Sequence, residues 1–174
     1  MVSLGRYPRL IEAVIENMGI EPGHSILDLG SGTGKNDCFI AKKIGSDGSI
    51  VGLDISDDML DRARNRCRNF PNVTFRKQRI ELPLPYEEDF DRVLVCFVLH
   101  GFEHDGKLRI IRGAHRALKP GGVFCVLDYA QFDLDSLKSI AKYLFGIEGE
   151  LPKYERPAVT PRKMLERFRQ SYGA

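Results

Sequence analysis

Three glycines stand at alternate positions directly after a short apolar segment, in the stretch SILDLGSGTGKND, residues 25–37. Glycine adopts backbone conformations that other residues avoid, so Gly30, Gly32 and Gly34 predict a tight turn in which the backbone can approach a ligand. Asp28 precedes this turn, and its carboxylate suits a ligand with an ammonium group better than one with two phosphates. The stretch therefore predicts a loop that binds a cofactor.

A second carboxylate stands near the end of the next apolar segment. This segment, SIVGLDIS at residues 49–56, contains Asp54, which could accept hydrogen bonds from both hydroxyls of a ribose. The spacing of the glycines is GxGxG, whereas the dinucleotide fingerprint is GxGxxG, so NAD is disfavoured without being excluded. Together the residues favour a nucleoside ligand with an amino-acid tail.

The elements that must position these residues alternate between strand and helix. β-Branched and continuous apolar runs predict strands, and amphipathic runs with glycine or proline at their ends predict the helices between them. Such alternation indicates an α/β fold, a doubly wound, Rossmann-like and mostly parallel sheet with helices on both faces. We expect strands at residues 25–29, 49–56, 73–78, 90–99 and 123–128, and helices at residues 7–20, 35–45, 57–70 and 106–119.

Length and composition bound the class of protein. With 174 residues, of which 43% are hydrophobic, the chain is long enough for a core of its own, and we expect a single domain over residues 1–174. Its core would span residues 20–130, and residues 131–174 would form a tail of helix and loop. The net charge of +2 favours a small-molecule partner over a nucleic acid.

The environment of the protein can be anticipated in the same way. No apolar run reaches the ~20 residues of a membrane span, and charged residues interrupt the N-terminal apolar pattern, unlike in a signal peptide. We therefore expect a cytoplasmic protein with no membrane span. The cysteines include no CxxC pair, so we expect reduced thiols and neither a metal site nor a disulfide framework; they are Cys38, Cys67, Cys96 and Cys125.

Several motifs together resemble the class I S-adenosylmethionine-dependent methyltransferases, and are similar to those of the ubiquinone/menaquinone C-methylases. The motifs are ILDLGSGTG, VGLDIS, ELPLPYEEDFDRVLVCFVLH and RALKPGGVFCVLDY, and the resemblance extends from about Pro8 to Tyr129. It implies S-adenosyl-L-methionine as cofactor and a small-molecule methyl acceptor. It also implies the cofactor-binding residues, which are Asp28, Gly30, Ser31, Gly32, Gly34, Asp54, Ile55, Arg79, Ile80 and Phe97.

The resemblance gives these residues distinct roles. The glycine loop would meet the methionine end, with Asp28 reaching its amino group, while Asp54 would bind the ribose and Ile55 would pack on one face of adenine. The other face would meet the turn after the third strand, where relatives often carry an acidic residue followed by a small apolar one. This chain carries Arg79 and Ile80 there, and arginine cannot accept a hydrogen bond from the adenine amino group.

Methyl transfer from a sulfonium needs positioning and exclusion of water more than a nucleophilic triad. An oxygen or acidic carbon acceptor would also need a general base, and His100 is best placed because it follows the fourth strand directly. His104, Asp128 and Tyr129 are further candidates. His100 could instead be a loop histidine bonded to backbone, and Phe97 could be either core or part of an acceptor pocket.

Three other functions compete with a small-molecule or lipid-like methyltransferase. A non-catalytic protein that retains the fold would explain Arg79 and the short C-terminal region. An arsenite methyltransferase is suggested by GTGKNDCF, in which Cys38 follows the glycine loop, although it stands one position late for that family. An oxidoreductase that binds NAD is the third.

The resemblance also sets an expectation for the sheet. Relatives have seven strands in the order 3-2-1-4-5-7-6, but the residues beyond Tyr129 show no strand pattern. We therefore expect five strands in the order 3-2-1-4-5, with strands 6 and 7 missing. The fifth strand would then be an open edge, covered either by residues 151–174 or by a second subunit in a homodimer.

Overall fold

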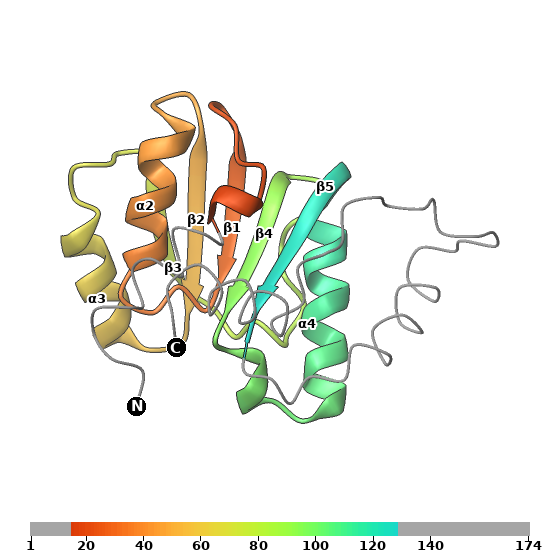
Figure 1. Cartoon of the computed structure of the whole chain (residues 1–174). Helices are drawn as coiled ribbons and strands as arrows, with labels where there is room; N and C mark the ends of the chain where they lie inside the picture. The colour runs from red at the N-terminus through yellow and green to blue at the C-terminus, as the bar shows by residue number, and fades with distance from the viewer. Residues whose placement is uncertain (1–14, 129–174) are drawn as a thin grey trace, which may run out of the picture.

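The computed structural model describes residues 15–128, and in this part of the chain five parallel strands form one sheet (Figure 1). The order of the strands is β3-β2-β1-β4-β5, which confirms the expected topology. The strands are β1 (Ser25–Leu29), β2 (Ser49–Asp54), β3 (Val73–Lys77), β4 (Phe90–Cys96) and β5 (Leu118–Leu127).

Helices connect the strands as expected. They are α2 (Lys35–Ile44), α3 (Asp57–Arg66) and α4 (His104–Ala117), with a 3-10 turn, η1 (Leu99–Gly101), before α4. Helix α3 ends earlier than the 57–70 that its pattern predicts, because a tight turn follows in which the Phe70 N–H donates to the Cys67 carbonyl. Of the helix expected at 7–20, residues 15–17 are described and helical, and the expected tail lies outside the described residues.

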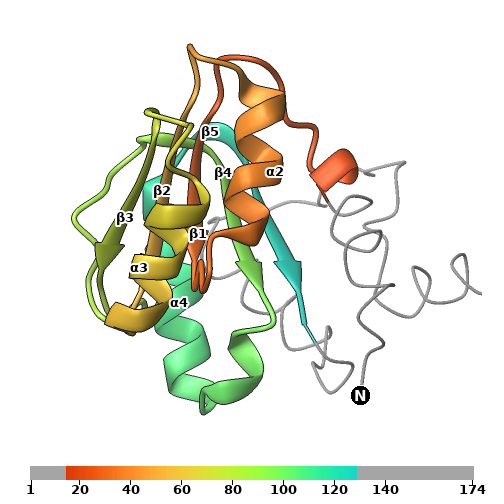
Figure 2. The ribbon, with the colours of Figure 1, turned by 90° about the vertical axis from the view of Figure 1, so that its left-hand side faces the viewer.

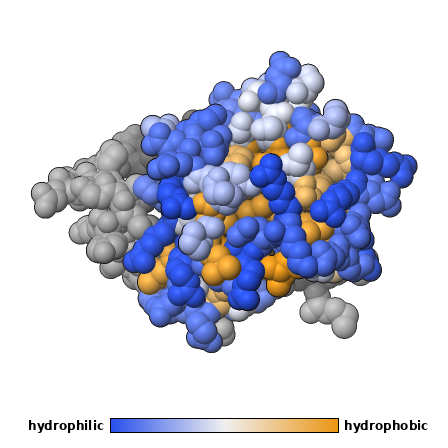
Figure 3. All heavy atoms as spheres, turned by 180° about the vertical axis from the view of Figure 1, so that it is seen from behind, coloured by the Kyte–Doolittle hydropathy of each residue, from blue (hydrophilic) through white to orange (hydrophobic). Residues whose placement is uncertain are grey.

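The helices cover both faces of the sheet, and alternation along the strands separates two cores. Ile26, Ile50 and Leu94 face α2, whereas Leu27 and Val93 face α4. Helices α2 and α3 pack near β2 and β3, and α4 packs near β4 and β5 (Figures 1 and 2). Seen from behind, apolar side chains gather in the middle of the molecule and hydrophilic ones border them (Figure 3).

Strand β5 begins earlier than its sequence predicts. The pattern places its start at Val123, after a break at Pro120-Gly121-Gly122, but Leu118 already pairs with Phe90 of β4. The register shifts between Phe90 and Arg92, so the glycine-rich segment is accommodated as an irregularity inside the strand.

A disulfide joins α2 to the end of α3, and the expectation of four reduced thiols is therefore wrong. Cys38 and Cys67 are 29 residues apart in sequence, but their Cα atoms are 5.6 Å apart because the two helices pack side by side. Cys96 and Cys125 remain free thiols. Sequence spacing carries no signal for such a pair, since it depends on how two helices pack.

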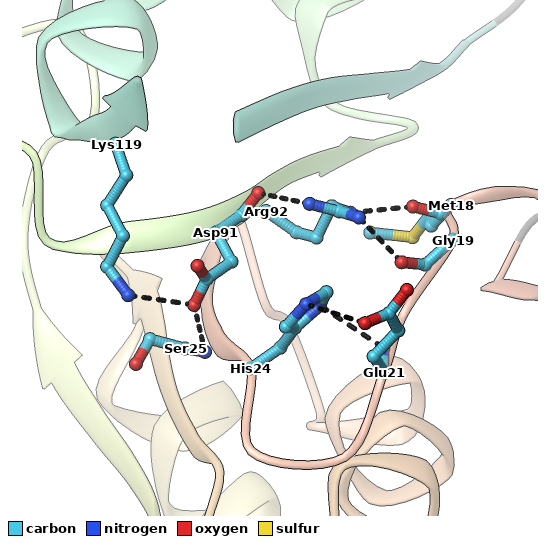
Figure 4. Close-up of polar contacts among 8 residues, drawn as sticks. All are labelled: Met18, Gly19, Glu21, His24, Ser25, Asp91, Arg92 and Lys119. Carbon is cyan, nitrogen blue, oxygen red and sulfur yellow. Dashed lines mark hydrogen bonds and ion pairs between the residues drawn. The ribbon is translucent and has the colours of Figure 1, made fainter. Parts of the chain in front are cut away.

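The amino ends of the strands are held together by paired charges (Figure 4). The Asp91 carboxylate accepts the Ser25 N–H at 2.8 Å and the Lys119 ammonium at 2.9 Å, which links β4 to β1 and β5. The Arg92 guanidinium donates to the carbonyl oxygens of Met18 and Gly19 at 2.7 and 2.6 Å. These contacts fix the chain before β1 to the centre of the sheet.

None of the helices in the part of the chain described is long and apolar enough to cross a membrane. Strand β5 is an edge of the described sheet, with Val123 and Val126 each 39% exposed. The residues expected to cover this edge lie outside the described residues, so both the covering tail and the homodimer stay predictions.

We predict that Asp91→Asn lowers the free energy of unfolding by about 1–2 kcal/mol at pH 7, because hydrogen bonds that involve a charged group are lost. Burial alone would raise the pKa of Asp91, but the Ser25 N–H and Lys119 outweigh it and lower the pKa. The stabilisation is therefore present above the unfolded pKa and is lost as pH falls through the folded one. Urea denaturation should show the difference between wild type and variant shrinking below pH about 4, while the exposed control Asp47→Asn should show none.

Candidate functional site

The parallel register brings three chain segments to one edge of the sheet. Strand β1 ends before Gly30, β2 ends at Asp54, and β4 ends three residues before Leu99 and the η1 turn. Asp28 pairs with Gly52 of β2 and with Leu94 of β4, so β1 is central and its loop lies between the other two ends. Open α/β sheets bind ligands at this carboxyl edge.

The three glycines of the loop do different things. A Cβ on Gly30 would lie 2.4 Å from Cγ2 of Val98, and a Cβ on Gly34 would lie 2.9 Å from Cβ of Ala63, so both positions are closed by packing. A Cβ on Gly32 would meet no atom within 4 Å. All three have positive φ, at 95°, 53° and 71° along the chain. Gly32 alone faces open space, where a ligand could approach the backbone.

Asp54 is fixed by the loop and by the start of α3. Its Oδ2 accepts the Gly32 N–H at 2.9 Å, and its Oδ1 accepts the Ser56 N–H at 2.9 Å. A carboxylate oxygen can accept more than one hydrogen bond, so both oxygens retain capacity for a ligand hydroxyl. The side chain thus shapes the loop and remains suited to the predicted ribose role.

Asp28 is fully buried beneath the loop, and neither of its carboxylate oxygens has a hydrogen-bond partner. Burial, followed by the charges of Asp37 and Asp54, raises the pKa of this carboxyl well above its usual value. The hydroxyl of Ser31 in the loop is also buried without a partner. Buried polar groups of this kind are seldom left unsatisfied, so their presence at the loop suits a polar ligand.

Sequence reasoning missed a second buried carboxyl, that of Asp37. It is 0% exposed, lies on the stripe of α2 that contains Ile40, Ala41 and Ile44, and has no hydrogen-bond partner for its side chain. Burial raises its pKa to about 7. A charged residue at helical spacing on an apolar stripe was the signal that could have revealed it.

The region predicted for adenine has one side open and one side closed. Ile55 is 63% exposed, so its side chain is accessible to an apolar ring. Ile80, by contrast, is 5% exposed and packs in the core. Arg79 forms an ion pair with Glu81, two residues later in the same turn. Leu82, 49% exposed, offers more apolar surface there than Ile80 does.

His100 is joined to Asp128 across the ends of β4 and β5. Asp128 Oδ1 lies 2.8 Å from the ring Nδ1, and Oδ2 accepts the His100 N–H at 2.9 Å. The Asp128 side chain is 3% exposed and the His100 side chain 49%. Phe97, close by, is partly buried against the core and has φ of 56°, a conformation that is strained for a residue with a side chain.

Among residues 15–128, no group of three or more His, Cys, Asp or Glu side chains is arranged to hold a metal. Cys38, the residue that suggested arsenite chemistry, is bonded to Cys67.

Comparison with known families agrees with this geometry: a family described as methyltransferase domain matches residues 20–158. The chain belongs to this methyltransferase family. A demethylmenaquinone methyltransferase of Tropheryma whipplei is 35% identical over 122 residues, which cover 68% of this chain and 47% of that protein. The ubiquinone/menaquinone biosynthesis C-methyltransferase UbiE of Pasteurella multocida is 35% identical over 144 residues, 80% of this chain and 52% of that protein.

This methyltransferase chain thus spans about half the length of these relatives. Solved structures show the same fold. A SAM-dependent methyltransferase from Aquifex aeolicus superposes with a TM-score of 0.65 at 20% identity, covering 77% of this chain and 78% of that one. An S-adenosylmethionine-dependent methyltransferase from Mesorhizobium loti has a TM-score of 0.60 at 30% identity, covering 71% and 52%.

We predict that alanine separates the roles of the loop glycines. Gly30→Ala should lower the free energy of unfolding by about 2–3 kcal/mol, because its Cβ would overlap Val98. Gly32→Ala should lower the free energy of unfolding by about 1 kcal/mol, because only the strain of a positive φ is added. Urea denaturation measures both, and equal losses would contradict the assignment of Gly32 to open space.

Proposed function

We propose that this chain catalyses transfer of a methyl group from S-adenosyl-L-methionine to a small or lipid-like acceptor. The observation that carries the proposal is the arrangement around Gly32, whose backbone faces open space and whose N–H is held by the Asp54 carboxylate, while the strand before the loop carries the buried Asp28. Ammonium, ribose hydroxyls and an apolar ring occur together in this cofactor, and the edge of the sheet offers a group for each.

The residues present fit the cofactor in three places. Asp28, buried without a partner, would attract the ammonium group of the methionine end. Asp54 would accept hydrogen bonds from the ribose, and Ile55 would cover one face of adenine. When bound, the cofactor supplies a methyl carbon that is already activated by its sulfonium. The protein then has to orient the acceptor, exclude water and remove a proton.

We propose that His100 accepts the proton that the methyl acceptor loses. Its Nδ1 can donate to Asp128, and this tautomer places the lone pair on Nε2. Nε2 would take the proton that the acceptor loses as its new bond to the methyl carbon forms and the carbon–sulfur bond breaks. Asp128 would hold the ring in this tautomer and stabilise the imidazolium, which makes it a positioning residue.

The acceptor we propose is a hydroxylated aromatic ring of the quinol type. Two similar proteins carry names from menaquinone and ubiquinone biosynthesis, which supports a ring of this chemistry. Removal of a phenolic proton makes the ring carbon beside the hydroxyl nucleophilic, so a general base at His100 fits such an acceptor. After that carbon is methylated, its own hydrogen would move to the phenolic oxygen and restore the aromatic ring, so that one proton in all is lost, to His100.

Binding of S-adenosylmethionine, measured by calorimetry, tests the cofactor site. Asp54→Ala should weaken binding by about 1–3 kcal/mol, because an acceptor for two hydroxyls is lost. Asp58→Ala is the matched control, since Asp58 lies in the first turn of α3, its side chain is 63% exposed and it pairs with Arg62. Unchanged affinity in Asp54→Ala would refute the ribose role, and failure of the wild type to bind would refute the proposed function.

Methyl transfer to demethylmenaquinol tests the base. His100→Ala should lower kcat by about 100-fold or more with a small effect on cofactor affinity, because loss of a general base affects the chemical step. Asp128→Asn should lower kcat less and move its pH profile, whereas the exposed control His104→Ala should change neither. Full activity of His100→Ala would exclude it as the base. Cofactor binding without transfer to this or related quinols would favour the non-catalytic alternative.

A further inference from the structure

Two carboxyl groups share one buried compartment behind the glycine loop. Alternation along β1 places Asp28 on the same face as Ile26, which α2 covers, and Asp37 lies on the stripe of α2 that faces the sheet. Both residues are 0% exposed, and their side-chain oxygens have no hydrogen-bond partner. After burial itself, the charge of Asp37 is the largest influence that raises the pKa of Asp28.

The other titratable groups that face this pair do not neutralise it. Asp54, at the end of β2, adds a further negative charge that acts on Asp28. Cys96 on β4 is a neutral thiol, because burial and then the charge of Asp28 raise its pKa to about 12, and Asp128 at the end of β5 acts in the same direction. The side chain of Asn36 bonds to this thiol, while its own Oδ1 is buried without a partner.

Two carboxylates that are close together and shielded from water do not both stay ionised. The cost of burying a second unpaired charge makes such a pair retain a proton, and the pair titrates as a unit. Burial raises the pKa of Asp37 to about 7 and that of Asp28 well above its usual value, so the pair keeps at least one proton up to neutral pH. Groups whose pKa values are perturbed by burial and by a specific charge partner cluster at functional sites.

An ammonium group is the cation whose bonding needs match two carboxyl groups. It needs only one or two carboxylates as partners, whereas a metal needs a larger set, and residues 15–128 hold no group of three metal-ligating side chains arranged for one. The compartment lies beneath the loop that we propose binds the ligand.

We propose that Asp37 is a positioning residue which shares a proton with Asp28 in the empty site and that this proton leaves when the ammonium group of the ligand binds beside Asp28. The inference rests on the proposed function, because it takes the methionine end of the cofactor as the ligand. The ammonium group brings one positive charge into the compartment and the proton removes one, so the net charge of the compartment does not change. Asp37 thereby links cofactor affinity to pH.

The sign of this linkage follows from the proton that is released. The ligand binds the ionised pair, so apparent affinity should rise with pH, by up to tenfold per pH unit, and level off above about pH 7. An α-amino group has a pKa of about 7.7–8.0, so the ligand stays a cation below that range and contributes no opposing titration.

Calorimetry with S-adenosylmethionine at pH 6.5 measures the proton directly. Titrations of the full chain in phosphate and in Tris, whose ionisation enthalpies differ, give the number of protons released per ligand bound. The wild type should release between half a proton and one proton, and Asp37→Asn should release clearly fewer, because only the burial of Asp28 and the charge of Asp54 then favour a bound proton. Asp47→Asn, which removes an exposed carboxylate in the turn after α2, should behave as the wild type.

The outcomes separate this inference from the function on which it rests. Failure of the wild type to bind would overturn both. Binding by the wild type without proton release, or equal release from Asp37→Asn, would overturn the role of Asp37 and leave the cofactor site intact. If Asp37→Asn does not fold, Asp37→Ser is the second neutral variant. The affinity of the wild type, measured between pH 5.5 and 7.5, is an independent test. An affinity that does not change over this range would contradict the proposal.

Discussion

The close approach of the glycine loop to its neighbours is the constraint on which the site depends. On one side of the loop, a side chain on Gly30 would overlap Val98. On the other side, a side chain on Gly34 would overlap Ala63 of α3. Because both flanks are held by packing, the residue between them, Gly32, is presented to open space, and its N–H is held by the Asp54 carboxylate. The same contacts that close the core therefore shape the surface at which a ligand would lie.

Charged side chains have partners at the amino edge of the sheet, whereas two buried carboxyls at the carboxyl edge lack them. At the amino edge, Asp91 is ion-paired with Lys119, and Arg92 donates to backbone carbonyls of the chain before β1, which it joins to the centre of the sheet. At the carboxyl edge, Asp28 and Asp37 are buried without partners. An unpaired buried carboxyl costs stability, so its presence in the most central strand is better explained by a bound cation than by folding. The paired charges that join the strands and the site proposed for the ligand thus lie at opposite ends of one sheet.

Sequence patterns predicted what depends on local periodicity, and missed what depends on packing between elements. The five strands and the position of Asp54 followed from apolar runs and from where they end. The disulfide between Cys38 and Cys67 did not, since it depends on the distance between two helices. The burial of Ile80 and the contact of His100 with Asp128 also needed the fold, because each involves residues that no sequence spacing relates.

The most direct test of this account is a titration of the ¹⁵N-labelled protein with S-adenosylmethionine, followed by amide correlation spectra. Saturable shifts should begin at Gly32 and Ile55, on either side of the Asp54 carboxylate, and Asp91 and Arg92 at the opposite edge should be unchanged. Saturable shifts confined to the edge around Asp91, or no shifts at all at millimolar ligand, would contradict the placement of the cofactor at the glycine loop.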